Sequence, residues 1–184
     1  MQPLELYIHI PFCVKKCAYC DFLSGPAGEK EKEEYVKMLV DEIKNCPDTV
    51  QNYRVISIFF GGGTPSLLTG EQIGRLMDTV REIFTLDEDA EITMEMNPGT
   101  VTEEKLRKYR QAGVNRLSIG LQSVNDEELR LLGRIHTYEE FREAYHLARA
   151  NGFSNINVDL ISAIPGQTVE SWRRTLEQVM ALSP

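Results

Sequence analysis

The sequence predicts an α/β protein built on a parallel β-sheet. Apolar segments of strand length alternate along the chain with amphipathic segments of helical length. Most of the helical segments also begin at a residue that can cap a helix. Strands and helices that alternate in this way form parallel sheets with right-handed crossovers. Because no shift in composition divides the chain, we expect one domain over residues 1–184.

The first half of the chain contains three predicted strands. They span residues 4–10, 54–60 and 91–96, and helices are expected between them at residues 31–45 and 69–84. In the first strand, Leu4, Leu6, Ile8 and Ile10 alternate with polar or aromatic residues and share one face. The second helix begins at Thr69, which can form a capping box with the glutamine three residues later.

The second half repeats the same pattern. Predicted helices begin after the capping residues Thr102, Asn125, Thr137 and Thr168, and predicted strands span residues 115–121 and 155–161. The last helix is expected to turn its apolar residues toward the core, namely Trp172, Leu176, Val179 and Met180. About five βα units give an open, curved sheet and not a closed eight-stranded barrel. The strand at 155–161 is then an exposed edge.

Composition restricts the class of protein. The chain has 184 residues, 42% of them hydrophobic and 26% charged, which is typical of a soluble globular domain. No apolar run approaches the ~20 residues that span a bilayer, and the N-terminus does not resemble a signal peptide, so we expect a cytoplasmic protein. The net charge of −8, without a block of Lys or Arg, argues against nucleic acid as a partner.

Three cysteines follow the first predicted strand within eight residues. Cys13, Cys17 and Cys20 lie on one loop, at the carboxyl end of the strand, which is where parallel α/β folds bind their ligands. Cysteine thiolates hold iron–sulfur clusters. Three thiolates can bind three corners of a cubane and leave the fourth iron free to bind a substrate.

Two other interpretations of the cysteines remain open at this point. A disulfide would leave one of the three unpaired, and a reducing compartment disfavours it. A structural zinc ion would need a fourth ligand, for which His9 is the candidate, although strand alternation places His9 before the loop. Cys46 lies outside the pattern, and we interpret it as a thiol with no role in the site.

The spacing C-x-x-x-C-x-x-C, with Tyr19 directly before the third cysteine, resembles that of the radical S-adenosylmethionine (SAM) enzymes. Further segments narrow the resemblance: "YIHIPFCVKKCAYCDF", "FFGGGTPSLL", "EMNPGT", "GVNRLSIGLQS", "LGRIHT" and "NVDLISAIPGQT". Together they resemble the oxygen-independent coproporphyrinogen III oxidase family, including its haem-chaperone branch, over essentially the whole chain. The resemblance implies a partial (βα)6-type radical SAM barrel that lacks the sixth strand and the C-terminal domain.

The resemblance also implies cofactors. Cys13, Cys17 and Cys20 would hold a [4Fe-4S] cluster, and the open iron would bind SAM. An electron from a donor such as flavodoxin or ferredoxin would then pass through the cluster to SAM. In the family, this cleaves SAM to methionine and a 5′-deoxyadenosyl radical, which abstracts hydrogen from the substrate.

The remaining site residues are assigned by similarity alone. Gly61, Gly62 and Gly63 would cradle the methionine end of SAM, with Tyr7 and Glu95 beside it. The neighbouring part of the pocket, where the oxidases hold a second SAM, would be lined by Tyr19, Gly63, Thr64, Gln122, Arg134 and Asp159. On the residues alone, the glycines also fit a tight turn, Glu95 fits a solvated strand end, and the others fit hydrogen bonds between loops.

The sequence departs from the oxidases after the third cysteine. True coproporphyrinogen oxidases carry Gly-Cys there, and this chain has Asp21 and Phe22. The departure favours the haem chaperones, which bind a cluster, SAM and haem, over a coproporphyrinogen III dehydrogenase that decarboxylates propionates. A porphyrinogen substrate would need basic groups, and only Arg134 and Arg116 are candidates. A zinc-stabilised α/β binding module is the remaining alternative.

Overall fold

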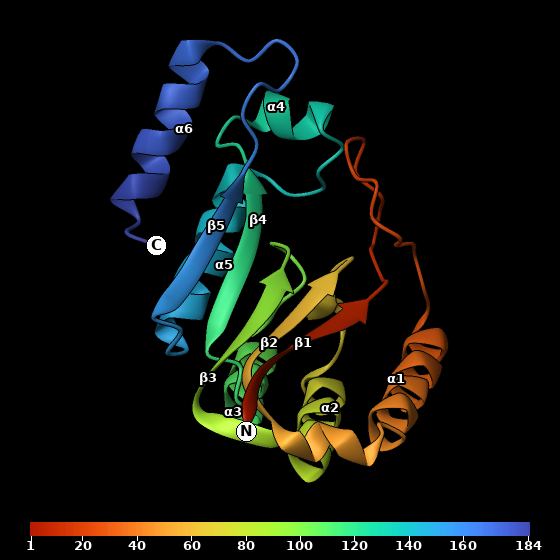
Figure 1. The fold of residues 1–184 in the computed structure, drawn as a ribbon. Helices are drawn as coiled ribbons and strands as arrows, with labels where there is room; N and C mark the ends of the chain where they lie inside the picture. Colours follow the sequence, from red (N-terminus) through yellow and green to blue (C-terminus); the bar gives the residue numbers. More distant parts are fainter.

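A computed structural model describes all residues, 1–184, and contains one parallel sheet in the strand order β1-β2-β3-β4-β5 (Figure 1). The strands are β1 (Gln2–Ile10), β2 (Tyr53–Gly62), β3 (Thr85–Met96), β4 (Arg116–Gln122) and β5 (Asn155–Leu160). The α-helices are α1 (Glu29–Lys44), α2 (Gly70–Ile83), α3 (Glu103–Ala112), α4 (Asp126–Leu131), α5 (Tyr138–Ala150) and α6 (Val169–Ala181). The predicted open α/β sheet is therefore confirmed. No helix is both long and apolar enough to cross a membrane.

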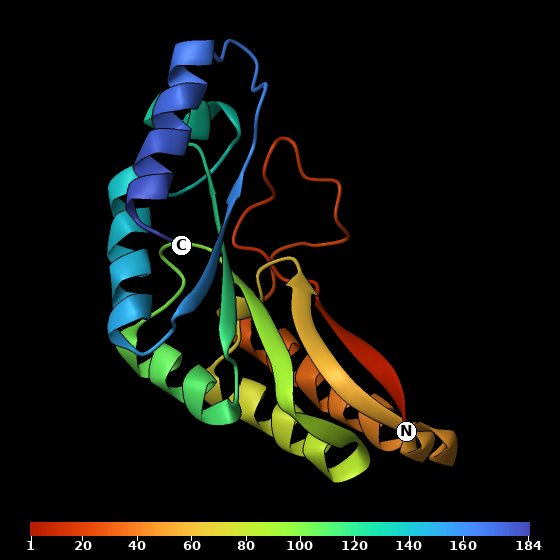
Figure 2. The same cartoon turned by 60° about the vertical axis from the view of Figure 1, so that its left-hand side comes forward.

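The two faces of the sheet differ because side chains alternate along each strand. One face carries apolar residues such as Ile10, Phe60 and Met94, which are fully buried in a core of 31 residues. The opposite face carries polar residues such as His9 and Glu95, which are only partly buried. Figure 2 shows the helices on the apolar side and the loop after β1 on the other side. The polar face is thus left open at the carboxyl ends of the strands.

Strand β3 begins six residues before the predicted position. Thr85 and Leu86 pair with Arg54 and Val55, and the register then shifts before Glu91 pairs with Ser57. The charged residues in the shifted segment interrupt the apolar pattern. For this reason, the sequence pattern does not predict a strand there. Two short 3₁₀ helices, at Asp48–Asn52 and Pro65–Leu67, were also not predicted.

The prediction for the last helix is largely wrong. Of its four apolar residues, only Val179 is buried, whereas Leu176 and Met180 are 37% and 74% exposed. Trp172 is only partly buried. Helix α6 follows the edge strand β5, so there is little of the sheet beneath it to cover these side chains (Figure 1).

Hydrogen bonds to one buried carboxylate hold the start of α6. Glu128 in α4 is 7% exposed and accepts from Ser123 Oγ at 2.6 Å, from Gln167 Nε2 at 2.8 Å and from Ser171 Oγ. Burial acts to raise the pKa of Glu128, but the three hydrogen bonds outweigh it and the pKa is lowered. The carboxylate therefore links α4 to the segment that begins α6.

We predict that Glu128→Ala lowers the free energy of unfolding by about 2 kcal/mol, because three donors lose their acceptor. Folding lowers the pKa of the Glu128 carboxyl. Its contribution to the free energy of unfolding is therefore full above the pKa that this carboxyl has in the unfolded chain, and it is lost as pH falls through the pKa that it has in the folded protein. Chemical denaturation at several pH values measures both effects. Glu127→Ala, at the exposed neighbour, is the control; an equal loss in both variants would contradict the prediction.

Candidate functional site

A cavity of about 310 Å³ lies at the carboxyl ends of the strands, on the open polar side of the sheet. Its walls contain all three clustered cysteines and eight of the ten predicted cofactor-binding residues, all except Tyr7 and Gly61: Cys13, Cys17, Cys20, Tyr19, Gly62, Gly63, Thr64, Glu95, Gln122, Arg134 and Asp159. These residues come from every strand or from the loop that follows it. The parallel topology therefore brings residues that are far apart in the sequence into one site.

Backbone hydrogen bonds fix the cysteine loop over this cavity. The N–H of Cys13 donates to Gly25 O at 2.9 Å, which closes the loop on itself. The N–H of Ala18 donates to Leu132 O at 2.9 Å and ties the loop to the end of α4. Its start is also held by β2, because the N–H of Thr64 donates to Phe12 O at 2.7 Å. The thiols are thus presented by a closed loop with three anchors.

The four cysteines are all free, and Cys46 lies apart from the other three, where its Sγ contacts Glu42 O at 3.8 Å. No group of three or more His, Cys, Asp or Glu side chains is arranged around a single metal ion. Both ring nitrogens of His9 already have partners, Tyr7 Oη and Leu23 O, each at 3.2 Å. The tetrahedral zinc site with His9 as fourth ligand is therefore not formed.

The glycines after β2 allow close contact with the cysteine loop. A Cβ atom added at Gly63 would lie 2.5 Å from Phe12 O, a distance that no real side chain tolerates. Gly62 has φ of 113°, which glycine adopts readily, and a Cβ there would meet the His9 ring at 2.5 Å. Packing against the loop thus accounts for Gly63, and packing against His9 of β1 accounts for Gly62, so their assignment to SAM stays a prediction.

Glu95 projects from β3 into the cavity and accepts from the N–H of Gly62, with its Oε2 at 3.0 Å. Burial raises the pKa of Glu95; the Gly62 hydrogen bond lowers it, nearby Asp159 raises it and His9 lowers it. The net effect is a raised pKa. A half-buried carboxylate with no cationic partner is suited to receive the positive part of a ligand.

Asp159 and Gln122 lie on the strands at the far side of the cavity. Asp159 accepts from Ser118 Oγ at 3.0 Å and from Asn157 Nδ2 at 2.7 Å, so both of its partners are neutral side chains. Gln122 ends β4 with φ of 75°, an uncommon conformation for a residue other than glycine. This conformation accompanies the register shift between β4 and β5 at the wall of the cavity.

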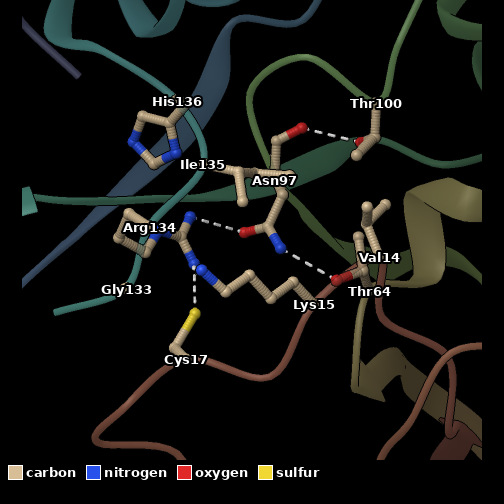
Figure 3. A pocket seen from close by; sticks show the side chains of 10 residues that line it. All are labelled: Val14, Lys15, Cys17, Thr64, Asn97, Thr100, Gly133, Arg134, Ile135 and His136. Atoms are coloured by element: carbon tan, nitrogen blue, oxygen red, sulfur yellow. Dashed lines mark hydrogen bonds between the residues drawn. The ribbon is translucent and has the colours of Figure 1, made fainter. Parts of the chain in front are cut away.

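Arg134 lies between the cysteine loop and β4 (Figure 3). Its Nη2 donates to Asn97 Oδ1 at 2.7 Å and to Gly120 O at 2.5 Å, and its Nη1 is 3.8 Å from Cys17 Sγ. Burial raises the pKa of the nearby Tyr19 to about 12, although the Arg134 charge acts to lower it. The Tyr19 phenol is therefore neutral at physiological pH.

A smaller pocket of about 20 Å³ adjoins the main cavity at Arg134 (Figure 3). Burial, with the nearby Arg134 charge, lowers the pKa of His136 to about 4, so its ring is neutral at pH 7. The atoms His136 Nε2 and Arg134 Nε are buried without a hydrogen-bond partner in the protein. The pocket has room for about one water molecule.

Some residues singled out from the sequence lie elsewhere. Tyr7 is on the same face of the sheet but outside the cavity, 60% exposed and stacked on Phe59 at 6.1 Å between ring centroids. Arg116 is at the opposite end of β4, where it pairs with Glu91 at 3.5 Å, and is therefore not a basic group of the site. Phe12 packs edge-on against Tyr35 in the core.

The cavity also contains residues that the sequence did not single out. They are Lys15, Lys16, Met96, Asn97, Ser118 and Gly120; Phe22, singled out after the third cysteine, also lines the cavity. Ser118 and Gly120 precede Gln122 by four and two residues on the same strand, so strand alternation was the signal that could have found them. Asn97 directly follows β3, which places it at the same edge of the sheet as Glu95.

The donors of the cavity fit an iron–sulfur cluster. Three free thiols line the loop side of the cavity, and the carboxylates of Glu95 and Asp159 line the side of the sheet. The corners of a cubane are spread in space, so its three thiolates need not converge on one point as those of a single ion must. No fourth cysteine lines the cavity, so one corner of such a cluster would have no protein thiolate.

Comparisons with known proteins agree with this geometry. The chain is 46% identical over 185 residues to the heme chaperone HemW of Escherichia coli, covering all of this chain and 49% of that protein. It is 39% identical over 184 residues to the oxygen-independent coproporphyrinogen III oxidase of Salmonella typhimurium, covering all of this chain and 40% of the oxidase. The chain thus spans about half the length of the curated relatives it matches.

Similarity to solved structures indicates the same family. Coproporphyrinogen III oxidase from Escherichia coli matches with a TM-score of 0.90 at 38% identity, over 100% of this chain and 42% of that one. The methyltransferase TsrM from Kitasatospora setae, at 16% identity and a TM-score of 0.64, shares the fold. The sequence itself matches the radical SAM superfamily over residues 7–179. The chain therefore belongs to the radical SAM superfamily, and this membership implies a [4Fe-4S] cluster and SAM.

Proposed function

We propose that the chain is the cluster- and SAM-binding part of a haem chaperone. In this proposal Cys13, Cys17 and Cys20 hold a [4Fe-4S] cluster, which when bound supplies the electron for reductive cleavage of SAM. The observation that carries the proposal is the single cavity that combines the three free thiols with polar groups from β3, β4 and β5. The zinc-stabilised module is not favoured, because no ligand set for a single ion is formed.

The residues divide the cavity into two parts with different roles. The thiols lie on the loop side, where Arg134 faces Cys17. Glu95 and Asp159 project from the sheet and offer carboxylates to the positively charged groups of SAM. Tyr19, Thr64 and Gln122 also line the cavity and would bind SAM through hydrogen bonds and van der Waals contacts. The Gly62 N–H already donates to Glu95, so we propose that Gly62 acts by orienting that carboxylate.

One feature of the sequence favours a haem chaperone over a coproporphyrinogen oxidase. Asp21 and Phe22 stand where the oxidases have Gly-Cys. Phe22 is 63% exposed at the mouth of the cavity, where it offers apolar surface to a planar ligand. Haem is therefore the proposed cargo, and a flavodoxin or ferredoxin is the proposed electron donor.

The test of the proposal combines spectroscopy with two ligands. The protein is reconstituted anaerobically with iron and sulfide, reduced with dithionite, and measured by electron paramagnetic resonance with and without SAM. A cluster signal that changes when SAM is added supports the cluster and SAM site. Haem titration followed by the Soret band, beside an assay for coproporphyrinogen decarboxylation, distinguishes the chaperone from the oxidase; decarboxylation without haem binding would favour the oxidase.

We predict that Cys17→Ser abolishes cluster assembly, whereas Cys46→Ser leaves it unchanged. Cys17 lines the cavity and Cys46 lies at the end of α1, outside it. Iron and acid-labile sulfide per protein measure the outcome, and circular dichroism checks that both variants are folded. Full iron and sulfide content in Cys17→Ser would show that the ligand assignment is wrong.

We predict that SAM binding by the reconstituted protein weakens as pH is lowered, and that Glu95 is the group responsible. Because burial raises the pKa of Glu95, the carboxylate is protonated at a higher pH than an exposed glutamate and then no longer attracts a cation. Isothermal titration with SAM across pH measures the effect, and Glu95→Gln should bind weakly at every pH. Glu91→Gln, at an exposed position on the same face of β3 but outside the cavity, should retain the wild-type profile.

A further inference from the structure

One chain of hydrogen bonds connects two of the three cysteine sulfurs, and Figure 3 shows its part from Cys17 to Thr64. Arg134 Nη1 is 3.8 Å from Cys17 Sγ, and Arg134 Nη2 donates to Asn97 Oδ1 at 2.7 Å. Asn97 Nδ2 donates to Thr64 Oγ1 at 2.8 Å, and Thr64 Oγ1 is 3.5 Å from Cys13 Sγ. Cys20 is not part of the chain. The amide of Asn97 is the central member, because it joins two arms. The Cys17 arm runs through Arg134, and the Cys13 arm runs through Thr64.

The chemistry of the donors fixes the direction of the bonds on both sides of the Asn97 amide. A guanidinium can only donate, so the atom of Asn97 that faces Arg134 must be the carbonyl oxygen. The other side of the amide is then the NH₂ group, which donates to the Thr64 hydroxyl oxygen. The proton of that hydroxyl is thereby left free for Cys13. A metal-bound thiolate can only accept, so with Cys13 in that form Thr64 donates to it, as Arg134 does to Cys17.

The central amide is held rigidly by its surroundings. The N–H of Asn97 donates to Ser66 Oγ at 3.3 Å, and its backbone carbonyl oxygen accepts from Thr100 Oγ1 at 2.7 Å. Thr64 is only 2% exposed, and Arg134 is anchored separately to Gly120 O at 2.5 Å. Water therefore does not compete freely for the bonds between these side chains.

We propose that Asn97 is a positioning residue of the cluster site. By fixing the bonds on both sides of its amide, it directs the Arg134 guanidinium to Cys17 and leaves the Thr64 hydroxyl proton free for a Cys13 thiolate, and it holds the cysteine loop against β2 and β4. Hydrogen bonds to ligand sulfurs tune the potential of an iron–sulfur cluster, and partners of the ligands orient them. This inference rests on the proposed cluster site, but its effect on the loop is measurable in the protein without a cluster.

Two substitutions separate the arms of the network. Asn97→Ala removes both arms. Asn97→Asp keeps an acceptor for Arg134, but the second oxygen of the new carboxylate can only accept, so the Thr64 hydroxyl turns toward this carboxylate and away from Cys13. The matched control is Asn115→Ala, which also removes two side-chain hydrogen bonds, with Ile92 N and Ala90 O at 2.8 Å each, but in the middle of β3 and outside the cavity.

The first measurement is hydrogen–deuterium exchange of the protein without a cluster. We expect exchange in residues 13–20 to be about tenfold faster in Asn97→Ala, because the loss of one or two hydrogen bonds weakens the anchoring of the loop. Asn115→Ala should leave these residues at the wild-type rate. Wild-type exchange of residues 13–20 in Asn97→Ala would overturn the proposal, whether or not the wild-type protein assembles a cluster.

The second measurement is the loss of iron from the reconstituted protein in the presence of a chelator. We expect the half-life of the cluster to fall at least about tenfold in Asn97→Ala, which is the usual effect of removing a partner of metal ligands. Asn97→Asp should lie between this variant and wild type, since it keeps the Cys17 arm. Equal half-lives in all three proteins would overturn the proposed role, whereas failure of the wild type to take up iron and sulfide would refute the proposed function.

Discussion

The site depends on one constraint, the parallel direction of all five strands. Because every strand ends at the same edge of the sheet, the loop with Cys13, the turn with Thr64 and the side chains of Glu95, Gln122 and Asp159 meet there. Alternation along the strands separates the roles of the two faces: the apolar one packs against helices, and the polar one is open to a ligand. Neither face could exchange its role without shifting the register of every strand.

The pairing of β1 with β2 continues past the ends of the strands and makes the cysteine loop part of the sheet. The N–H of Gly63 donates to Ile10 O at 2.9 Å, and the N–H of Thr64 donates to Phe12 O at 2.7 Å. This contact is possible because Gly63 has no Cβ, which would lie 2.5 Å from Phe12 O. The glycine run thus has a structural role in placing the thiols, in addition to any contact that its backbone makes with a ligand.

Features that depend on neighbouring residues could be predicted from the sequence. Features that depend on contacts made only in the folded chain could not. Strand alternation and capping residues placed the elements, and the cysteine spacing identified the loop. The early start of β3 was missed because charged residues fill its register shift. The contact between Arg134 and Cys17 joins residues 117 positions apart, and no local pattern predicts it. Asn97 was missed for the same reason, since its importance lies in the two partners that the fold brings to it.

The charges of the site are separated, and none of them is neutralised by an ion pair within the site. Arg134 donates to an amide, a carbonyl and a thiol, whereas Asp159 accepts from a hydroxyl and an amide, and Glu95 accepts from a backbone N–H. Neutral partners satisfy the hydrogen bonds of these side chains but do not neutralise their net charges. A net charge is costly to bury without an opposite charge nearby. A ligand with both signs of charge would relieve this cost on both sides of the cavity at once, and SAM carries a carboxylate together with ammonium and sulfonium groups. The same separation disfavours a ligand of one sign, because it would approach like charges on one wall.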